Sequence, residues 1–337
     1  MTPLRVGLVG AGGITGAHVI AWAGLGADLH IHALENAHEL AARCGASVAG
    51  SLEELLERVD VVDVCTPTAT HAPIVEAALR AGKDVVCEKP LTRHAEEARA
   101  LVKLAENLGR RIYPAHVVRY FPPYAQAKAA IDAGRLGEPA VLRFTRTGTF
   151  PRIPWFADEA SSGGLIMDLM IHDLDQAVWM AGPARSVYAA GNRFDTSPPV
   201  QIANFTLTHE SGAISHCRGL WGSTGTRFGY TFHLTGTGGV LRFDSQADQG
   251  FALEAAALSG AQTEDGYLPP TQFFDNPYQA EINDFAREIQ GGLPARVSAG
   301  DGLHAVELAT AALESMRTGR PVDTSALSPA TPQEVRA

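Results

Sequence analysis

An apolar run that leads directly into a glycine-rich turn opens the chain, and no other feature limits its possible folds so strongly. Residues 4–16 read LRVGLVGAGGITG. A short apolar run before glycines and a helix-forming segment predicts a buried strand, a tight turn and a helix start. Gly10 would permit the tight turn, and Gly12 would let an anionic group reach the backbone at the helix N-terminus.

The glycine spacing comes close to the fingerprint of a dinucleotide-binding loop. Gly10 and Gly12 occupy the first two glycine positions, whereas Thr15 stands at the third and Gly16 follows it. The third glycine serves helix–strand packing more than phosphate contact. The match alone fits an ordinary glycine turn equally well, but its position after a strand at the start of a βαβ array favours a dinucleotide site. The loop residues expected to contact the dinucleotide are Gly10, Gly12, Gly13 and Ile14.

Apolar runs alternate with helix-like segments through the first 120 residues. Ser51 and Glu54 form a capping box that marks one helix start. This alternation predicts a doubly wound parallel sheet covered on both faces, in a domain of residues 1–120. The predicted strands are Leu4–Val9, Leu29–Leu34, Val59–Cys65, Asp84–Cys87 and Ile112–Ala115, and the predicted helices include Leu52–Arg58, Pro73–Ala81 and Ala95–Leu108.

Beyond Tyr120, strand-like runs follow one another with few helices between them, which predicts an open, mostly antiparallel sheet. We assign residues 121–325 to this α+β domain and residues 326–337, rich in Pro, Ser and Thr, to a loose tail. The predicted strands are Ala140–Thr147, Ser186–Arg193, Val200–Thr208, Ile214–Trp221, Tyr230–Thr235 and Val240–Phe243, and the predicted helices are Pro123–Ala133, Gly164–Met180, Pro277–Gln290 and Asp301–Thr318, the last two capped by Asn276 and Ser298.

The charge balance disfavours nucleic acid and membrane partners. The chain has 37 acidic and 27 basic residues, and its formal net charge of -10 repels phosphate backbones and anionic lipid. No stretch approaches the roughly 18 consecutive apolar residues of a membrane helix, and the N-terminus lacks a signal-peptide pattern. The 4 cysteines show no metal-like spacing. We therefore expect reduced thiols, no metal site and a cytoplasmic protein.

An acidic residue follows the second predicted strand. In dinucleotide-binding folds, a carboxylate at this place accepts hydrogen bonds from the ribose hydroxyls of NAD. Glu35 lies about 20 residues beyond the glycine loop, one step past the usual strand tip. No arginine follows it to bind a 2′-phosphate, which favours NAD over NADP. Glu35 is equally interpretable as a solvated charge at the start of the next helix.

Polar residues gather at the carboxyl ends of the later predicted strands. In a doubly wound sheet these ends form one edge, where ligands bind. Each residue has an ordinary structural explanation, such as capping or a surface ion pair, but their shared placement indicates a site. They are Thr66, Pro67 and His71 after Cys65, Glu88 and Lys89 after Cys87, and His116 and Arg119 after Ala115.

The motifs that carry these residues resemble the Gfo/Idh/MocA family of NAD(P)-dependent oxidoreductases. They are GAGGITGAH at 10–18, VDVCTPTATHAPIVEAALRAGKDVVCEKPL at 62–91 and GGLIMDLMIHDLD at 163–175. The resemblance implies a Rossmann first domain, NAD as cofactor with NADP as the alternative, and Lys89 as the active-site lysine. It also implies a cis peptide bond between Lys89 and Pro90. The free-energy cost of the cis form is small there because proline reduces the preference for trans.

A second group of candidate residues lies on the predicted helix Gly164–Met180. Asp168, His172 and Asp175 share one stripe of an otherwise apolar helix. The pattern alone fits an amphipathic helix that turns this stripe to water. The resemblance implies instead that Asp168 and His172 are catalytic. Met170 stands where many relatives have glycine, and we expect it to narrow the space near the site.

The resulting hypothesis is hydride transfer between the nicotinamide and a secondary alcohol or carbonyl of a sugar, inositol or related polyol. His172 suits a general base, Asp168 could orient it, and Lys89 could stabilise the developing oxygen charge or carry the proton itself. The residues expected to contact the substrate are Lys89, His116, Arg119, Trp155, Asp168 and His172.

Two other functions stay open at this level. The resemblance includes relatives that hydrolyse glycosides with tightly held NAD, and a cofactor-binding regulator without turnover is a third possibility. For any of them, the open sheet of the second domain would leave a broad β surface exposed. We therefore expect a homodimer or homotetramer formed through that face.

Overall fold

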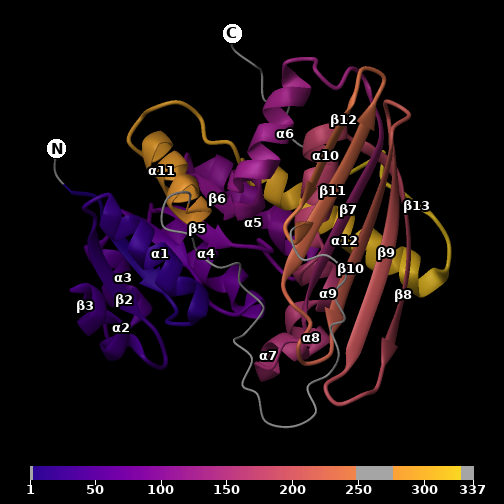
Figure 1. Ribbon diagram of the computed structural model, residues 1–337. Helices are drawn as coiled ribbons and strands as arrows, with labels where there is room; N and C mark the ends of the chain where they lie inside the picture. Colours follow the sequence, from indigo (N-terminus) through magenta and orange to yellow (C-terminus); the bar gives the residue numbers. More distant parts are fainter. Residues whose placement is uncertain (1–2, 248–275, 328–337) are drawn as a thin grey trace. The chain divides into compact units, whose positions relative to one another are not determined.

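A computed structural model, shown in Figure 1, describes residues 3–247 and 276–327. The described residues form two compact units, one from 3–121 and 276–303, the other from 122–247 and 304–327. The first unit thus includes a segment, 276–303, that the sequence analysis assigned to the second domain. Of the tail expected at 326–337, residues 328–337 lie outside the described part of the chain.

The first unit is built on a six-stranded, wholly parallel sheet, as the alternation of strands and helices predicted. The strand order β3-β2-β1-β4-β5-β6 reverses direction beside β1, which is the switch point of a doubly wound fold. The strands are β1 (Arg5–Val9), β2 (Asp28–His32), β3 (Ser47–Val48), β4 (Val61–Val64), β5 (Asp84–Glu88) and β6 (Ile112–Ala115).

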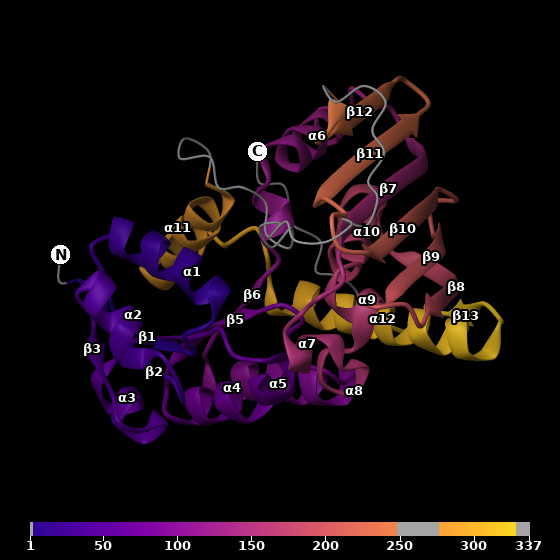
Figure 2. The same ribbon diagram turned by 60° about the horizontal axis from the view of Figure 1, so that its bottom comes forward.

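Helices cover both faces of this sheet, and most residues of the strands β1, β4, β5 and β6 are apolar and buried. In Figure 2, α1 (Gly13–Gly24) and α11 (Pro277–Ile289) lie together on one face, while α3 (Leu52–Arg58), α4 (His71–Arg80) and α5 (Ala95–Leu108) lie on the other. A further helix, α2 (Ala37–Cys44), follows β2. The ring of Phe285 on α11 packs 5.2 Å from that of Tyr113 on β6, which anchors this late segment to the first unit.

The predicted helix caps are present. Ser51 Oγ accepts the N–H of Glu54 at 3.1 Å, although the Glu54 carboxylate takes the N–H of Gly50 instead of closing the box on Ser51. Ser298 and Asp301 form the complete reciprocal box, with distances of 2.8 and 3.2 Å. Because caps depend on residues three apart in sequence, they are readable without the fold.

The second unit contains a seven-stranded mixed sheet of order β12-β11-β7-β10-β9-β8-β13. Among the described strand pairs of this second sheet, only β7–β10 is parallel, so the expected, mostly antiparallel sheet is confirmed. The strands are β7 (Pro139–Thr149), β8 (Ala184–Phe194), β9 (Val200–His209), β10 (Ile214–Gly222), β11 (Gly229–Gly236), β12 (Val240–Asp244) and β13 (Val322–Asp323).

The long helix expected over Gly164–Met180 is two helices, α9 (Gly164–Asp168) and α10 (Ile171–Ala181). The hydrogen-bond ladder changes between them: the N–H of Met170 bonds to Leu165 O, five residues back, and that of Asp173 to Met170 O, three back. Both helices pack on one face of the sheet, with α6 (Pro122–Asp132) beside α10.

The remaining helices are α7 (Pro154–Ala157), α8 (Glu159–Ser162) and α12 (Ala299–Thr318). Two short 3₁₀ turns, η1 (Thr68–Thr70) and η2 (Val117–Tyr120), follow β4 and β6. Within the described ranges, no helix is long and apolar enough to span a bilayer.

Candidate active site

The turn between β1 and α1 requires glycine at its first position. Gly10 has φ +109°, in the left-handed region, and its N–H bonds to His32 O at 2.9 Å. A Cβ at Gly10 would lie 2.6 Å from the carbonyl oxygen of Cys65. Gly10 therefore permits the tight turn, as the sequence predicted, and it also lets the loop pass close to the end of β4.

The N-terminus of α1 presents uncovered backbone N–H groups. Gly12 occupies the N-cap without a side-chain hydrogen bond, and the first turn contains no acidic residue. A Cβ at Gly12, Gly13 or Gly16 would meet no described atom within 4 Å. Thr15 is fully buried at the third glycine position, where it packs inside the unit. These residues fit a pyrophosphate bound at the helix N-terminus.

Glu35 lies three residues beyond the last residue of β2, in the turn before α2. Both Glu35 and Leu34 are exposed, Leu34 almost completely. Asn36 has φ 61° and occupies the N-cap of α2 without a side-chain cap bond. The carboxylate is therefore exposed beyond the strand end, and an apolar side chain stands before it.

The loops after β4 and β5 are joined by a buried histidine. His71 Nδ1 lies 2.9 Å from Pro90 O, and its Nε2 lies 2.9 Å from Thr66 O. Burial lowers the pKa of His71 in spite of these carbonyl contacts. Thr66 and Pro67 precede the η1 turn at the same strand end. His71 thus connects two of the strand ends singled out by sequence.

Lys89 follows the last residue of β5 and precedes a cis peptide bond to Pro90, as the family resemblance implied. Its backbone N–H donates to Glu88 Oε2 at 3.0 Å. Lys89 is partly exposed, whereas Glu88 and Pro90 are buried. The backbone at Lys89 is therefore held by the Glu88 carboxylate and lies between two buried residues.

Arg119 and His116, at the end of β6, are both buried. Arg119 Nη2 lies 3.1 Å from Asp301 Oδ1, and Nη1 donates to Arg296 O at 3.2 Å. Burial raises the pKa of Asp301, but Arg119 and the Ser298 cap outweigh burial and lower it overall. Arg119 thus binds within the first unit, a contact that spacing alone did not indicate.

In the second unit, Asp168 ends α9 and His172 is the second residue of α10. Both are buried, as are Asp173 and Asp175, so the alternative of a polar stripe turned to water is wrong. Asp173 forms a bidentate ion pair with Arg146 of β7, at 2.9 and 3.1 Å. This pair fixes the helix one residue beyond His172.

Met170 lies in the break between the two helices, and its side chain is fully buried. A Cβ added at Gly219 of β10 would lie 2.4 Å from Met170 Cγ and Sδ. The bulk of Met170 is thus accommodated by a glycine of the sheet. These contacts place the side chain against β10, and the expectation that Met170 narrows the site stays a prediction. Trp155, on α7, is partly exposed and packs against Phe156.

The first unit therefore belongs to the class of doubly wound dinucleotide-binding domains, with its glycine loop at the switch point. Residues 4–116 match the family model described as "Oxidoreductase family, NAD-binding Rossmann fold", and residues 124–242 match the "GFO/IDH/MocA C-terminal domain". The chain therefore belongs to the Gfo/Idh/MocA family of oxidoreductases, and its first domain is an NAD-binding Rossmann fold.

Known relatives and solved structures are similar to this chain over nearly its full length. The chain is 30% identical to an inositol 2-dehydrogenase of Rhizobium meliloti (strain 1021), over 95% of this chain and 98% of the relative. GenD2 from gentamicin A biosynthesis, solved with NAD, has a TM-score of 0.83 at 27% identity, covering 96% and 97% of the two chains. A myo-inositol dehydrogenase from Corynebacterium glutamicum ATCC 13032 has a TM-score of 0.78 at 27% identity, covering 95% and 98%.

Two buried polar residues near the strand ends were not predicted from the sequence. Asp63 is an acid inside the apolar strand VVDV, and His18 follows the glycine loop on α1. A charged residue in a strand buried on both faces is a signal of a buried partner. The partner itself lies 45 residues away in sequence, so its identity was not readable.

Proposed function

We propose that this protein is an NAD-dependent dehydrogenase that oxidises a secondary alcohol of a cyclic polyol or sugar, with inositol as the first candidate. The observation that supports this most is the uncapped N-terminus of α1, followed along the same sheet edge by the Lys89 segment. The relatives named inositol 2-dehydrogenase support the substrate class.

The proposed catalytic residues are Lys89, Asp168 and His172. His172 accepts the hydroxyl proton as hydride leaves the carbon, and Asp168 orients and stabilises the imidazolium that forms. Lys89 stabilises the negative charge that develops on the oxygen. Bound NAD supplies the hydride acceptor.

The residues proposed to bind NAD are those of the glycine loop and the strand ends. Backbone N–H groups at Gly12, Gly13 and Ile14 would hold the pyrophosphate, which the α1 dipole also favours. Glu35 is the proposed partner of the ribose hydroxyls. Thr66, Pro67, His71 and Glu88, in the loops after β4 and β5, would complete the NAD site. Trp155, His116 and Arg119 are the further substrate contacts that we propose, and Arg119 also bonds to Asp301 and to Arg296 O within the first unit.

The test is a screen of inositols, sugars and related polyols with NAD and NADP in parallel, followed at the nicotinamide absorbance band. We expect reduction of NAD by at least one cyclic polyol. Glycoside hydrolysis without net change in the cofactor would replace this proposal with the hydrolase, and NADH binding without turnover of any substrate would replace it with the regulator.

We further propose a cytoplasmic homodimer or homotetramer formed through the helix-free face of the second unit's sheet. Side chains on that face alternate with the buried ones, and several apolar residues there are exposed, namely Tyr188, Ile214 and Val240. A hollow on the same sheet is lined by Arg143, His216 and Arg218, among others. An exposed β surface of this size favours association with a second copy.

A further inference from the structure

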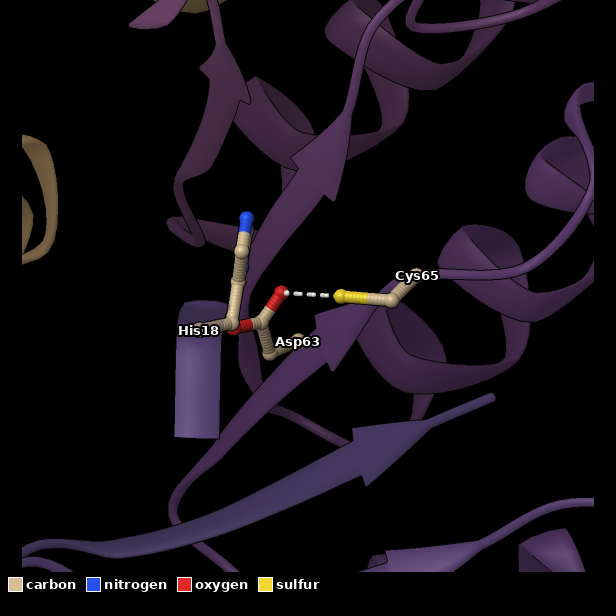
Figure 3. A group of neighbouring side chains, drawn as sticks. All are labelled: His18, Asp63 and Cys65. Carbon is tan, nitrogen blue, oxygen red and sulfur yellow. Dashed lines mark hydrogen bonds and ion pairs between the residues drawn. The ribbon is translucent and has the colours of Figure 1, made fainter. Parts of the chain in front are cut away.

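A cluster of buried polar side chains lies beneath the proposed NAD loop and the Lys89 segment. Figure 3 shows its centre, His18 from α1, Asp63 from β4 and Cys65 just beyond it. His18 and Asp63 have no exposed surface, and Cys65 is buried beside them. The Cys65 thiol donates to Asp63 Oδ1 at 3.4 Å. None of the proposed catalytic roles uses these residues.

The imidazole of His18 has a carboxylate at each of its two nitrogens. Nδ1 lies 2.8 Å from Asp63 Oδ2, and Nε2 lies 3.1 Å from Glu88 Oε1. A carboxylate only accepts, so both contacts are hydrogen bonds only if both ring nitrogens carry a proton. Burial lowers the pKa of His18, but the adjacent Asp63 carboxylate opposes burial, and the pKa is raised well above its usual range. His18 is therefore an imidazolium that bridges β4 and β5.

The bridge continues to the active-site lysine through Glu88. One oxygen of Glu88 accepts from His18, and the other accepts the backbone N–H of Lys89 at 3.0 Å. On the far side of Lys89, the carbonyl of Pro90 contacts His71 Nδ1 at 2.9 Å. The main chain is thus held immediately before and after the residue whose side chain must reach the substrate.

We propose that His18 is a positioning residue for Lys89, acting through Glu88, in the reaction set out under the proposed function. Its imidazolium fixes the Glu88 carboxylate, and this carboxylate fixes the Lys89 backbone. Asp63 serves to hold the ring, and it accepts a second bond from Trp22 Nε1 at 2.7 Å. Small displacements of a catalytic group reduce turnover steeply because reacting atoms must be aligned.

The other titratable groups that face His18 come from α11. Glu281 is fully buried, and neither of its carboxylate oxygens has a hydrogen-bond partner within the described residues. Burial raises its pKa well above the usual range although His18 opposes this, and Glu88 and Asp63 add to the rise, so the neutral, protonated form is favoured. The Tyr278 ring lies 6.2 Å from His18, and the phenol is neutral. The charge of His18 is therefore balanced by Asp63 and Glu88.

A metal ion is the alternative occupant of this cluster, because ligand atoms of His18, Asp63 and Cys65 all lie within 4.8 Å of one another. Two observations favour the proton. Both ring nitrogens already contact carboxylates, and burial raises the pKa of the Cys65 thiol to about 12, which opposes the thiolate that a metal would need.

Two substitutions of His18 separate its two contacts. The amide nitrogen of asparagine occupies roughly the place of Nδ1, and that of glutamine the place of Nε2. His18→Gln therefore keeps a donor for Glu88, and His18→Asn keeps one for Asp63 only. We expect His18→Asn to lower kcat about tenfold to a hundredfold with the KM for NAD nearly unchanged, whereas His18→Gln retains most of the wild-type kcat. Equal kcat values in the two folded variants would overturn the proposal.

A readout without substrate makes the test independent of the proposed function. The lysines of the chain are Lys83, Lys89, Lys103 and Lys128, so ¹⁵N-lysine labelling yields a simple amide spectrum, in which Lys89→Arg identifies the Lys89 peak. We expect this amide proton, bonded to a carboxylate, to move upfield in His18→Asn and stay in place in His18→Gln. An unmoved peak in His18→Asn would contradict the inference even if polyols are oxidised. If no polyol is oxidised, the proposed function fails and the peak still decides the inference.

Added Co²⁺ provides the remaining arm of the experiment. A thiolate–cobalt absorption band in the wild-type protein that disappears in Cys65→Ser would show a metal in place of the proton and overturn the proposal. We expect no such band.

Discussion

Gly10 and Gly12 stand two residues apart and meet different physical requirements. Gly10 is needed by the fold itself, because its left-handed backbone and the nearby Cys65 carbonyl exclude any side chain. Gly12 has open space where a Cβ would lie, so the fold alone does not require glycine there. In the proposed function, the need for glycine at Gly12 comes from the bound pyrophosphate, which must approach the backbone closely.

This difference predicts opposite behaviour of two substitutions. Gly12→Val should leave the melting temperature nearly unchanged and weaken NADH binding at least about a hundredfold, as expected when several charge-assisted hydrogen bonds are blocked. Gly10→Ala should instead lower the melting temperature. Calorimetry and NADH fluorescence titration measure both effects. Undiminished NADH affinity in a folded Gly12→Val protein would show that the loop does not bind the pyrophosphate.

Lys89 is the residue on which the proposed chemistry depends most. Lys89→Ala should lower kcat by about 10²–10⁴ because the developing charge on the substrate oxygen loses its stabilising cation. NADH affinity should persist. Lys103→Ala, at an exposed position of α5, is the matched control and should turn over normally. Steady-state kinetics with the substrate found in the screen provides the measurement, and a fully active Lys89→Ala would exclude the mechanism.

Glu281 makes the stability of the protein depend on pH. Its pKa is raised in the folded state, so its contribution to stability is complete below the unfolded pKa of about 4.3 and is lost as the pH rises toward the folded pKa. Glu281→Gln does not titrate. Its melting temperature relative to wild type should therefore become more favourable between pH 5 and pH 8. The exposed control Glu106→Gln should show no such trend, and a constant difference for Glu281→Gln would refute the assignment.

At the scale of elements, most helices and strands begin and end close to where local patterns placed them. The β6 strand and the α3 and α5 helices have the predicted bounds. The exception is the helix over Gly164–Met180, which breaks after Asp168. Hydrophobic periodicity does not reveal this break, because Leu169 and Met170 continue the apolar pattern. Packing of Met170 against Gly219 of a distant strand accompanies the break.

The Arg146–Asp173 ion pair joins β7 to α10 and should contribute strongly to the second unit. Burial raises the pKa of Asp173, although Arg146 opposes this effect. Arg146→Met would leave a buried carboxylate without its cation and should destabilise the unit by about 3–5 kcal/mol. The double variant Arg146→Met, Asp173→Leu should recover part of that loss. Calorimetric melting distinguishes the two, and a single variant as stable as wild type would contradict this account.

At the scale of the whole molecule, the helix-free face of the second sheet leads to a prediction about assembly. Ile214, on β10 near the middle of that sheet, is 36% exposed. Ile214→Arg should shift the protein toward monomer in sedimentation velocity experiments, because it places a charge in the apolar contact. Ile20→Arg, 64% exposed on α1 of the first unit, is the control and should leave assembly unchanged. A monomeric wild-type protein would refute the prediction.

The sequence by itself determined the fold class, the glycine loop, the helix caps and the strand ends where candidate residues gather. These features depend on residues close together in the chain, whose spacing reflects local backbone geometry. Only the tertiary structure decided which buried charges meet. His18 contacts Asp63 and Glu88, which are 45 and 70 residues away, and Arg119 contacts Asp301, 182 residues away. Such pairs form because a buried charge requires a partner, but the chain can supply that partner from any distance.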